Sequence, residues 1–335
     1  MDGSGSSGDY VSDVVRFGGI DLDDQQFGIG YVSSSQEGIM GIGYPINEVA
    51  VAYNGGNPYP NVPLHLMQSG HISSNAYSLW LNDLDASTGS ILFGGVNSGK
   101  YTGQLSTLPI IREQGVYAEF IIALTGVGAN GTSGSIARNI ATPALLDSGS
   151  SLMYLPDDIV TTIYNDVGAQ YDQSQGAAFV DCNLANSHAT IDLTFSEPTI
   201  SIAMNELVIV AGSQGNKPLC ILGISPTGGS TPVLGDTFLR SAYVVYDLTN
   251  NEISIAQTNF NSTSNNIQEI TNSTSIPSAT NVANAVTSVA VQSGGARNND
   301  GFSSVTSSAF AVPTAALGYN AALLGAVGAG IAFAI

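Results

Sequence analysis

Short runs of apolar and β-branched residues, each ended by glycine, asparagine or aspartate, fill residues 9–258 and favour an all-β fold. The 39 glycines among 335 residues fit the many turns that such a fold needs. The clearest hairpin signal is the apolar run 242–247, followed by Asn250-Asn251 and a second run at 253–255. Further strands are expected at 11–17, 27–32, 77–81, 90–93, 117–124, 190–195, 199–202 and 206–210, and helices at 63–69 and 156–167.

One expected strand leads directly into an acidic turn. Residues 144–152 read Ala-Leu-Leu-Asp-Ser-Gly-Ser-Ser-Leu, which places the carboxylate of Asp147 in a turn rich in hydroxyl groups. Acid-type peptide hydrolysis needs two carboxylates that share a proton, because two like charges so close together cannot both ionise. The sequence contains no second copy of this motif, so it offers one half of such a pair.

The charge balance excludes some partners. Acidic residues outnumber basic ones 26 to 7, and the formal net charge is −19. Nucleic acid and anionic lipid surfaces would be repelled, so neither is expected to bind. Two explanations of the acidity stay open: the protein works at low pH, where protonation reduces its self-repulsion, or the acidity keeps a Ser- and Gly-rich chain soluble.

Other chemistries lack the residues that they need. No Gly-x-Ser-x-Gly sequence is present and the three histidines are isolated, so a serine triad is not supported. The one Gly-Lys pair is followed by tyrosine, which excludes a phosphate-binding loop. Cys182 and Cys220 match no metal-site spacing, so no metal and no cofactor is expected. They would form a disulfide in an oxidising compartment and remain two unrelated thiols in the cytosol.

The C-terminal end predicts a lipid anchor. No charged residue follows Ser303, and the chain ends in the apolar run 321–335, with small residues at 293–296 and 299–301 before it. Small residues, a spacer and a hydrophobic tail form the pattern of GPI attachment. A weak transmembrane anchor is the rival explanation, although the run is short for a bilayer span.

The stretch before this tail predicts a glycosylated stalk at the cell surface. Residues 259–301 are rich in Asn, Ser and Thr, and they contain sequons at Asn261 and Asn272, while Asn130 begins a third. A surface protein enters the secretory pathway, yet the chain starts Met-Asp-Gly-Ser-Gly without an apolar leader. Either this start is artificial, or the true N-terminus and its signal peptide lie upstream.

Four segments in this order resemble the pepsin-like aspartic proteases, over about three quarters of the chain. In chain order they are the apolar-Gly stretch Gly38–Pro45, the stretches 90–96 and 101–103 that join the two lobes, the motif at 145–151, and the second apolar-Gly stretch Val233–Arg240. The GPI-like tail narrows the resemblance to fungal, yapsin-like members. The resemblance implies an all-β, bilobal fold, an endopeptidase that acts on peptides or proteins, and a monomer.

The resemblance also assigns roles to individual residues. Asp147 would be one of two catalytic carboxylates, Ser148 would form a hydrogen bond across the lobe interface, and Ser150 would donate to the carboxylate. Gly149 would allow a close backbone turn. Gly41 and Gly235 would pack beside the two catalytic loops. Ordinary turns and turn capping explain the same serines and glycines without any catalytic role.

The family pattern is incomplete at the N-terminal end. Asp2-Gly3-Ser4 resembles the tip of the flap that closes over substrate, so the flap tyrosine and the first catalytic aspartate would lie before Met1. The expected parts are the remainder of the first lobe at 1–108, a near-complete second lobe at 109–258, the stalk at 259–301 and the tail at 302–335. We therefore expect an endopeptidase chain that is inactive as written.

Two further expectations follow from the family resemblance. Pepsin-like proteins often carry a disulfide in the second lobe, which implies a bond between Cys182 and Cys220. The alternative to an enzyme is a non-catalytic cell-wall or adhesion protein that keeps the protease scaffold.

Overall fold

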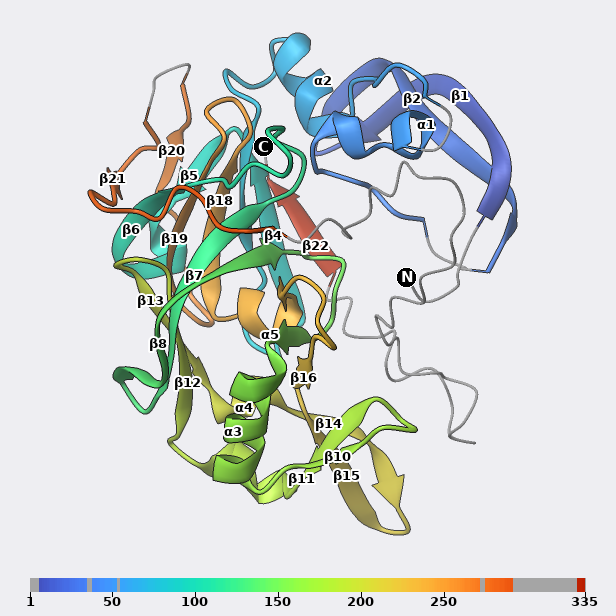
Figure 1. The fold of residues 1–335 in the computed structure, drawn as a ribbon. Coiled ribbons are helices and arrows are strands. Elements are labelled where there is room, and N and C mark those ends of the chain that lie inside the picture. The colour runs from blue at the N-terminus through green and yellow to red at the C-terminus, as the bar shows by residue number, and fades with distance from the viewer. Residues whose placement is uncertain (1–5, 35–37, 53–54, 272–274, 292–329, 335) are drawn as a thin grey trace.

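The computed structural model of the chain describes residues 6–34, 38–52, 55–271, 275–291 and 330–334 (Figure 1). Its regular structure is mostly β, as the turn-rich sequence predicts. The helices of the described residues are α1 (Val49–Ala52), α2 (Val62–Gln68), α3 (Asp157–Val167), α4 (Met204–Leu207) and α5 (Asp236–Leu239), and short 3₁₀ helices lie at Pro45–Asn47, Ser98–Lys100 and Cys182–Asn186.

Both predicted helices are confirmed. Helix α3 follows Pro156, carries two aspartates in its first turn and ends at Gly168, whose φ of 70° is left-handed. The Asn61 side chain caps α2 by accepting the Leu64 N–H at 3.4 Å. Turn and cap chemistry thus sets the limits of these helices.

A seven-stranded sheet carries the acidic motif. Its order is β13-β12-β7-β8-β17-β9-β16. The strands are β7 (Ile121–Ala129), β8 (Thr132–Leu146), β9 (Met153–Leu155), β12 (Thr190–Thr194), β13 (Thr199–Ala203), β16 (Ile224–Pro226) and β17 (Val233–Leu234). The short β17 lies between β8 and β9, parallel to the first and antiparallel to the second. It therefore fixes both ends of the loop that contains Asp147.

A second seven-stranded sheet, which we call the back sheet, has the order β21-β6-β19-β18-β3-β4-β22. Its strands are β3 (Ala76–Trp80), β4 (Thr88–Phe93), β6 (Tyr101–Pro109), β18 (Ala242–Asp247), β19 (Glu252–Thr258), β21 (Ala279–Asn281) and β22 (Gly330–Ala334). The predicted hairpin is confirmed as β18 and β19, with Asp247 opposite Glu252. Residues of both large sheets share one core, in which the rings of Tyr77 and Tyr246 stack with centroids 5.0 Å apart.

The N-terminal hairpin forms a separate two-stranded sheet of β1 (Ser6–Phe17) and β2 (Ile20–Ser33), beside α1 and α2 in Figure 1. Leu22 joins the main core, and the Gln25 amide donates to the Pro60 carbonyl at 3.0 Å. The far end of β2 is exposed, and Val32 keeps 70% of its surface accessible. The hairpin is therefore attached to the body near its turn.

A smaller sheet covers the far end of the molecule. Its order is β10-β11-β15-β14, formed by β10 (Gln170–Asp172), β11 (Ala177–Val180), β14 (Val208–Gln214) and β15 (Lys217–Leu222). Strand β11 pairs with β15 so that Val180 lies opposite Cys220. This register brings Cys220 of β15 close to Cys182, which lies just after the end of β11.

Residues 259–271 and 275–291, which we call the strap, belong to the predicted stalk and lie against the body. Its strand β20 (Ile267–Glu269) pairs with β5 (Gly95–Asn97), and β21 runs parallel to β6 (Figure 1). Ile270 and Ile276 are 1% and 3% exposed in a cluster with residues of the back sheet. Strand pairing and the burial of these two isoleucines together fix the strap against the body.

Candidate active site

The acidic turn begins where β8 ends. The Leu146 N–H donates to the Phe120 carbonyl at 3.0 Å, and the Asp147 N–H donates to the Leu234 carbonyl at 3.1 Å. Ala144 and Leu146 are buried in the main core, which fixes the strand just before the turn. Asp147 is therefore attached by its backbone to β17 and anchored by its neighbours.

Both oxygens of the Asp147 carboxylate accept hydrogen bonds from the turn itself. The Gly149 N–H donates to Oδ1 at 2.9 Å, and the Ser150 hydroxyl donates to Oδ2 at 2.6 Å. A Cβ at position 149 would lie 3.1 Å from Oδ1, so glycine permits this close approach. The two bonds hold the half-buried carboxylate in one orientation.

Gly235 packs directly against this turn. A Cβ at this position would lie 2.1 Å from the Ser150 carbonyl oxygen and 2.4 Å from that of Leu152, far inside contact distance. The next residue, Asp236, donates its N–H to the Ser150 carbonyl at 2.8 Å. Only glycine allows the two segments to come this close.

Asp236 is a site residue that the sequence reasoning missed. Burial raises the pKa of its carboxyl from 3.8 to about 7; the Arg240 guanidinium opposes this rise, and the charge of Asp147 adds to it. Electrostatic coupling to Asp147 places a second acidic group close to the first. One feature of the sequence could have indicated this residue: Asp236 directly follows the apolar-Gly pair Leu234-Gly235, at a position where an apolar side chain would be easier to bury.

A buried ion pair between Arg240 and Glu206 lies close to Asp236. The Arg240 Nε donates to Glu206 Oε2 at 2.9 Å, and its Nη2 donates to the Glu206 carbonyl at 2.6 Å. The same carboxylate accepts the Leu84 N–H at 3.0 Å, which links α4 to the turn between β3 and β4. Burial raises the pKa of Glu206, and the bonds from Arg240 oppose that rise.

Aromatic rings lie beside the carboxylates. Tyr246 is 2% exposed, and its ring centroid lies 4.7 Å from that of Phe120. Burial, and then the charges of Asp147 and Asp236, raise the pKa of the Tyr246 phenol above its ordinary value. Tyr246 therefore stays neutral and provides an apolar surface next to the two acids.

Several predicted residues lie apart from this group. Ser148 is exposed, and its hydroxyl makes no hydrogen bond within the described part of the chain. Gly41 is also exposed, and nothing lies within 4 Å of where its Cβ would be, so no packing against a catalytic loop is seen for it within the described ranges. Asp2, Gly3 and Ser4 of the predicted flap lie outside the described residues.

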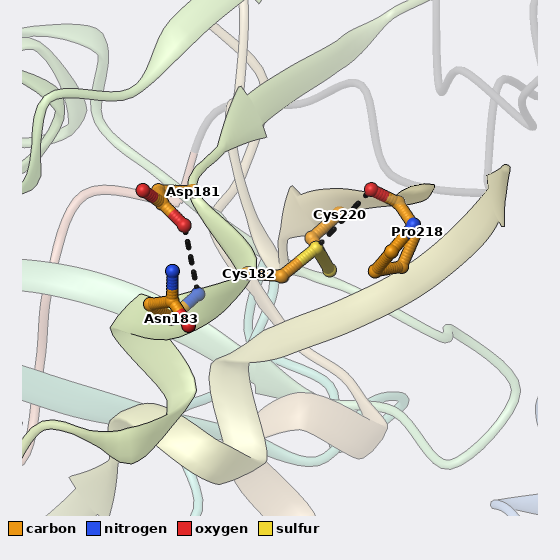
Figure 2. Close-up of a disulfide and its surroundings, with 5 residues drawn as sticks. All are labelled: Asp181, Cys182, Asn183, Pro218 and Cys220. Carbon is orange, nitrogen blue, oxygen red and sulfur yellow. Dashed lines mark hydrogen bonds between the residues drawn. A yellow bond between two sulfur atoms is a disulfide. The ribbon is translucent and has the colours of Figure 1, made fainter. Parts of the chain in front are cut away.

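The disulfide between Cys182 and Cys220 is confirmed, with the two Cα atoms 5.3 Å apart (Figure 2). Cys220 comes from β15, and Cys182 opens the 3₁₀ helix that Asp181 caps through the Asn183 N–H at 2.9 Å. The Cys182 sulfur lies 3.5 Å from the Pro218 carbonyl oxygen. The bond ties the small sheet to the segment that precedes β12.

The sequons that the structure describes lie on exposed turns. Asn130 is in the left-handed turn between β7 and β8, and Asn261 lies near the start of the strap, bonded to Asn82 and Asp83. Asn272 and almost all of the predicted tail lie outside the described residues.

Metal-binding clusters and membrane-spanning helices are both absent from the described residues. No cluster of three or more His, Cys, Asp and Glu side chains is arranged to hold a metal ion in this part of the chain. No helix in the same residues combines the length and hydropathy needed to cross a membrane.

Known proteins similar to this chain include aspartic endopeptidases of fungi. The chain is 55% identical over 304 residues to "Probable aspartic-type endopeptidase opsB" of Aspergillus oryzae, covering 88% of this chain and 62% of that protein. It is 39% identical over 295 residues to "Aspartic proteinase 3" of Saccharomyces cerevisiae, covering 83% and 50%. It therefore spans less than two thirds of the length of these relatives.

A solved structure supports the fold. The crystal structure of aspartic proteinase from Irpex lacteus matches with a TM-score of 0.66 and 24% identity, over 79% of this chain and 82% of that one. Residues 1–258 match the family model described as eukaryotic aspartyl protease, and this match spans the turn at Asp147. The chain belongs to the eukaryotic aspartyl protease family.

Proposed function

We propose that this chain is the part of an aspartic endopeptidase that carries one of its two catalytic carboxylates, Asp147. The observation that supports the proposal is the doubly hydrogen-bonded carboxylate, held in a turn that packs against Gly235. The family match and the endopeptidase names of the relatives point to peptides as substrates.

The proposed chemistry divides two tasks between two carboxylates. One, ionised, accepts a proton from a water molecule as the water oxygen attacks the peptide carbonyl carbon. The other, protonated, donates its proton to the carbonyl oxygen, so that the tetrahedral intermediate forms without a free charge. A single carboxylate supplies one of these tasks and not the other.

Asp236 is not proposed as the second catalytic carboxylate. It follows Gly235 behind the turn, its N–H is bonded to Ser150, and its side chain lies beside Arg240. The sequence contains one Asp-Ser-Gly and no Asp-Thr-Gly, so we propose that residues 1–335 alone do not cleave peptides.

The experiment compares purified 1–335 with the protein expressed from the full transcript, each assayed with a peptide library between pH 3 and 6. We expect no cleavage by 1–335, and cleavage by the longer protein that Asp147→Asn abolishes. Cleavage by 1–335 that Asp147→Asn abolishes would contradict the single-carboxylate proposal. Cleavage by the longer protein that survives Asp147→Asn would remove Asp147 from the mechanism, and no cleavage by either protein would favour the wall or adhesion role.

We also propose that the mature protein is held at the cell surface by a GPI anchor after cleavage near residue 302. The uncharged tail, the small residues before it and the sequons support this. A peptide tag placed after Ile335 should be lost from the mature protein, and phospholipase C should release the protein from cells. A tag that persists on surface protein would indicate a transmembrane anchor instead.

A further inference from the structure

The last part of the strap lies along the sheet that carries Asp147. The Val282 N–H donates to the Thr107 carbonyl at 3.0 Å, and the Val286 N–H donates to the Ser196 hydroxyl at 3.1 Å. Beyond these bonds, Val286, Val289 and Val291 pack against a small buried cluster of Ile111, Ile121 and Ala123. The strap therefore leaves the back sheet and continues onto β7.

This small cluster is on the face of β7 and β8 away from the main core. Leu145 packs against it, whereas its neighbours Ala144 and Leu146 are buried in the main core. Successive side chains of a strand point to opposite faces, so the end of β8 has the core on one side and the strap cluster on the other. Leu145 is two residues before Asp147.

Backbone hydrogen bonds connect the cluster to the acidic turn. The Ile111 N–H donates to the Ile121 carbonyl at 2.8 Å, and Ile121 pairs with Leu145 across β7 and β8. The next residue of β8, Leu146, is bonded through its N–H to Phe120. A displacement of β7 at Ile121 would therefore move the strand end from which Asp147 projects.

The other end of the strap is fixed independently. Ile270 and Ile276 are buried with Trp80, Val96 and Tyr243, on the opposite side of the back sheet from the main core. None of these residues belongs to the sheet that carries Asp147. The strap thus has three apolar attachments: these isoleucines, Val282 and Ala285 against the main core, and the valines on the cluster beside the acidic turn.

We propose that Val286 and Val289 are positioning residues for Asp147: they hold the outer face of β7 and β8 so that the carboxylate keeps its orientation. The inference rests on the proposed role of Asp147 in catalysis, but its first test needs no catalysis. Neither valine contacts the carboxylate, so both act through Ile121 and Leu145.

The test measures amide hydrogen exchange in the full chain 1–335. In Val286→Ala/Val289→Ala we expect exchange in residues 142–150 to be at least fivefold faster, with exchange in 242–247 unchanged. The matched control Ile276→Ala truncates the isoleucine attachment and should speed exchange near 242–247 while leaving 142–150 unchanged. The conservative variant Val286→Ile/Val289→Ile should keep the wild-type rate in 142–150.

Two results would overturn the proposal. Unchanged exchange at 142–150 in the double alanine variant would show that the valines do not support the turn. Equal acceleration at 142–150 by Ile276→Ala would show that the strap contributes only general stability. Failure of Asp147→Asn to affect cleavage by the longer protein concerns the proposed function instead, so the two failures are distinguishable.

Discussion

Asp236→Asn should make the stability of the protein less dependent on pH. The carboxyl has a pKa of about 7 in the folded protein and 3.8 in its ordinary state. Between these values the folded state holds a proton that the unfolded state releases, so the free energy of unfolding falls as the pH rises from about 4 to about 7. The amide of asparagine does not titrate, so the substitution should remove this decrease in the free energy of unfolding.

The size of the effect follows from the shift. Each pKa unit corresponds to about 1.4 kcal/mol, so a rise of about three units amounts to a loss of about 4 kcal/mol above pH 7. This value already includes the attraction of Arg240, because that charge is one of the causes of the net shift. We expect Asp236→Asn to match the wild type near pH 4 and to be more stable by about 2–4 kcal/mol at pH 8.

The assay is urea unfolding of 1–335 at pH 4, 5.5, 7 and 8. Asp166→Asn, the same acid-to-amide change at an exposed position of α3, serves as control. If Asp236→Asn loses as much stability as the wild type between pH 4 and 8, the buried carboxyl is not the cause of the slope. That result would also remove the argument that Asp147 and Asp236 interact through their charges.

Three further predictions concern the contacts around the site. Gly235→Ala should cost at least about 2 kcal/mol of thermal stability because its Cβ meets a carbonyl oxygen, whereas Gly41→Ala, with open space around it, should cost almost nothing; equal effects would contradict the packing. Arg240→Met should cost about 3–5 kcal/mol in urea unfolding by leaving a buried carboxylate unpaired, and a second change of Glu206 to Gln should recover more than half of it. Removing the disulfide by serine substitution at both cysteines should cost about 3–4 kcal/mol for a loop of 38 residues, and mass spectrometry of unreduced protein should detect the linked peptides; two alkylatable thiols would contradict it.

Local chemistry made much of the fold predictable. The β18–β19 hairpin and helix α3 follow from turn and cap residues that act within a few positions of the chain. The turn at Asp147 was predictable for the same reason, because the atoms that hold the carboxylate are two and three residues away. Contacts between residues only a few positions apart can be predicted without knowing which distant segments of the chain pack together.

The features that sequence reasoning missed depend on distant partners. The strap reads as a polar stalk because Ile270 and Ile276 are isolated in the sequence. They are buried by residues such as Trp80 and Val96, more than 160 positions earlier, and by Tyr243 of β18. The raised pKa of Asp236 depends on burial and on Asp147, which is far away along the chain. Gly41 and Gly235 follow similar apolar pairs, yet only Gly235 meets another backbone segment.

The strap also determines how the protein would respond to mechanical force. If residues beyond Val291 connect the body to the cell wall, tension on that connection reaches the valine contacts on β7 first. It reaches the Val282 hydrogen bond next, and then β21, which is pulled along its own axis beside β6. The attachments lie in series along the chain. A pulling experiment should therefore release them one after another, and the contacts of Ile276 and Ile270 should be lost last.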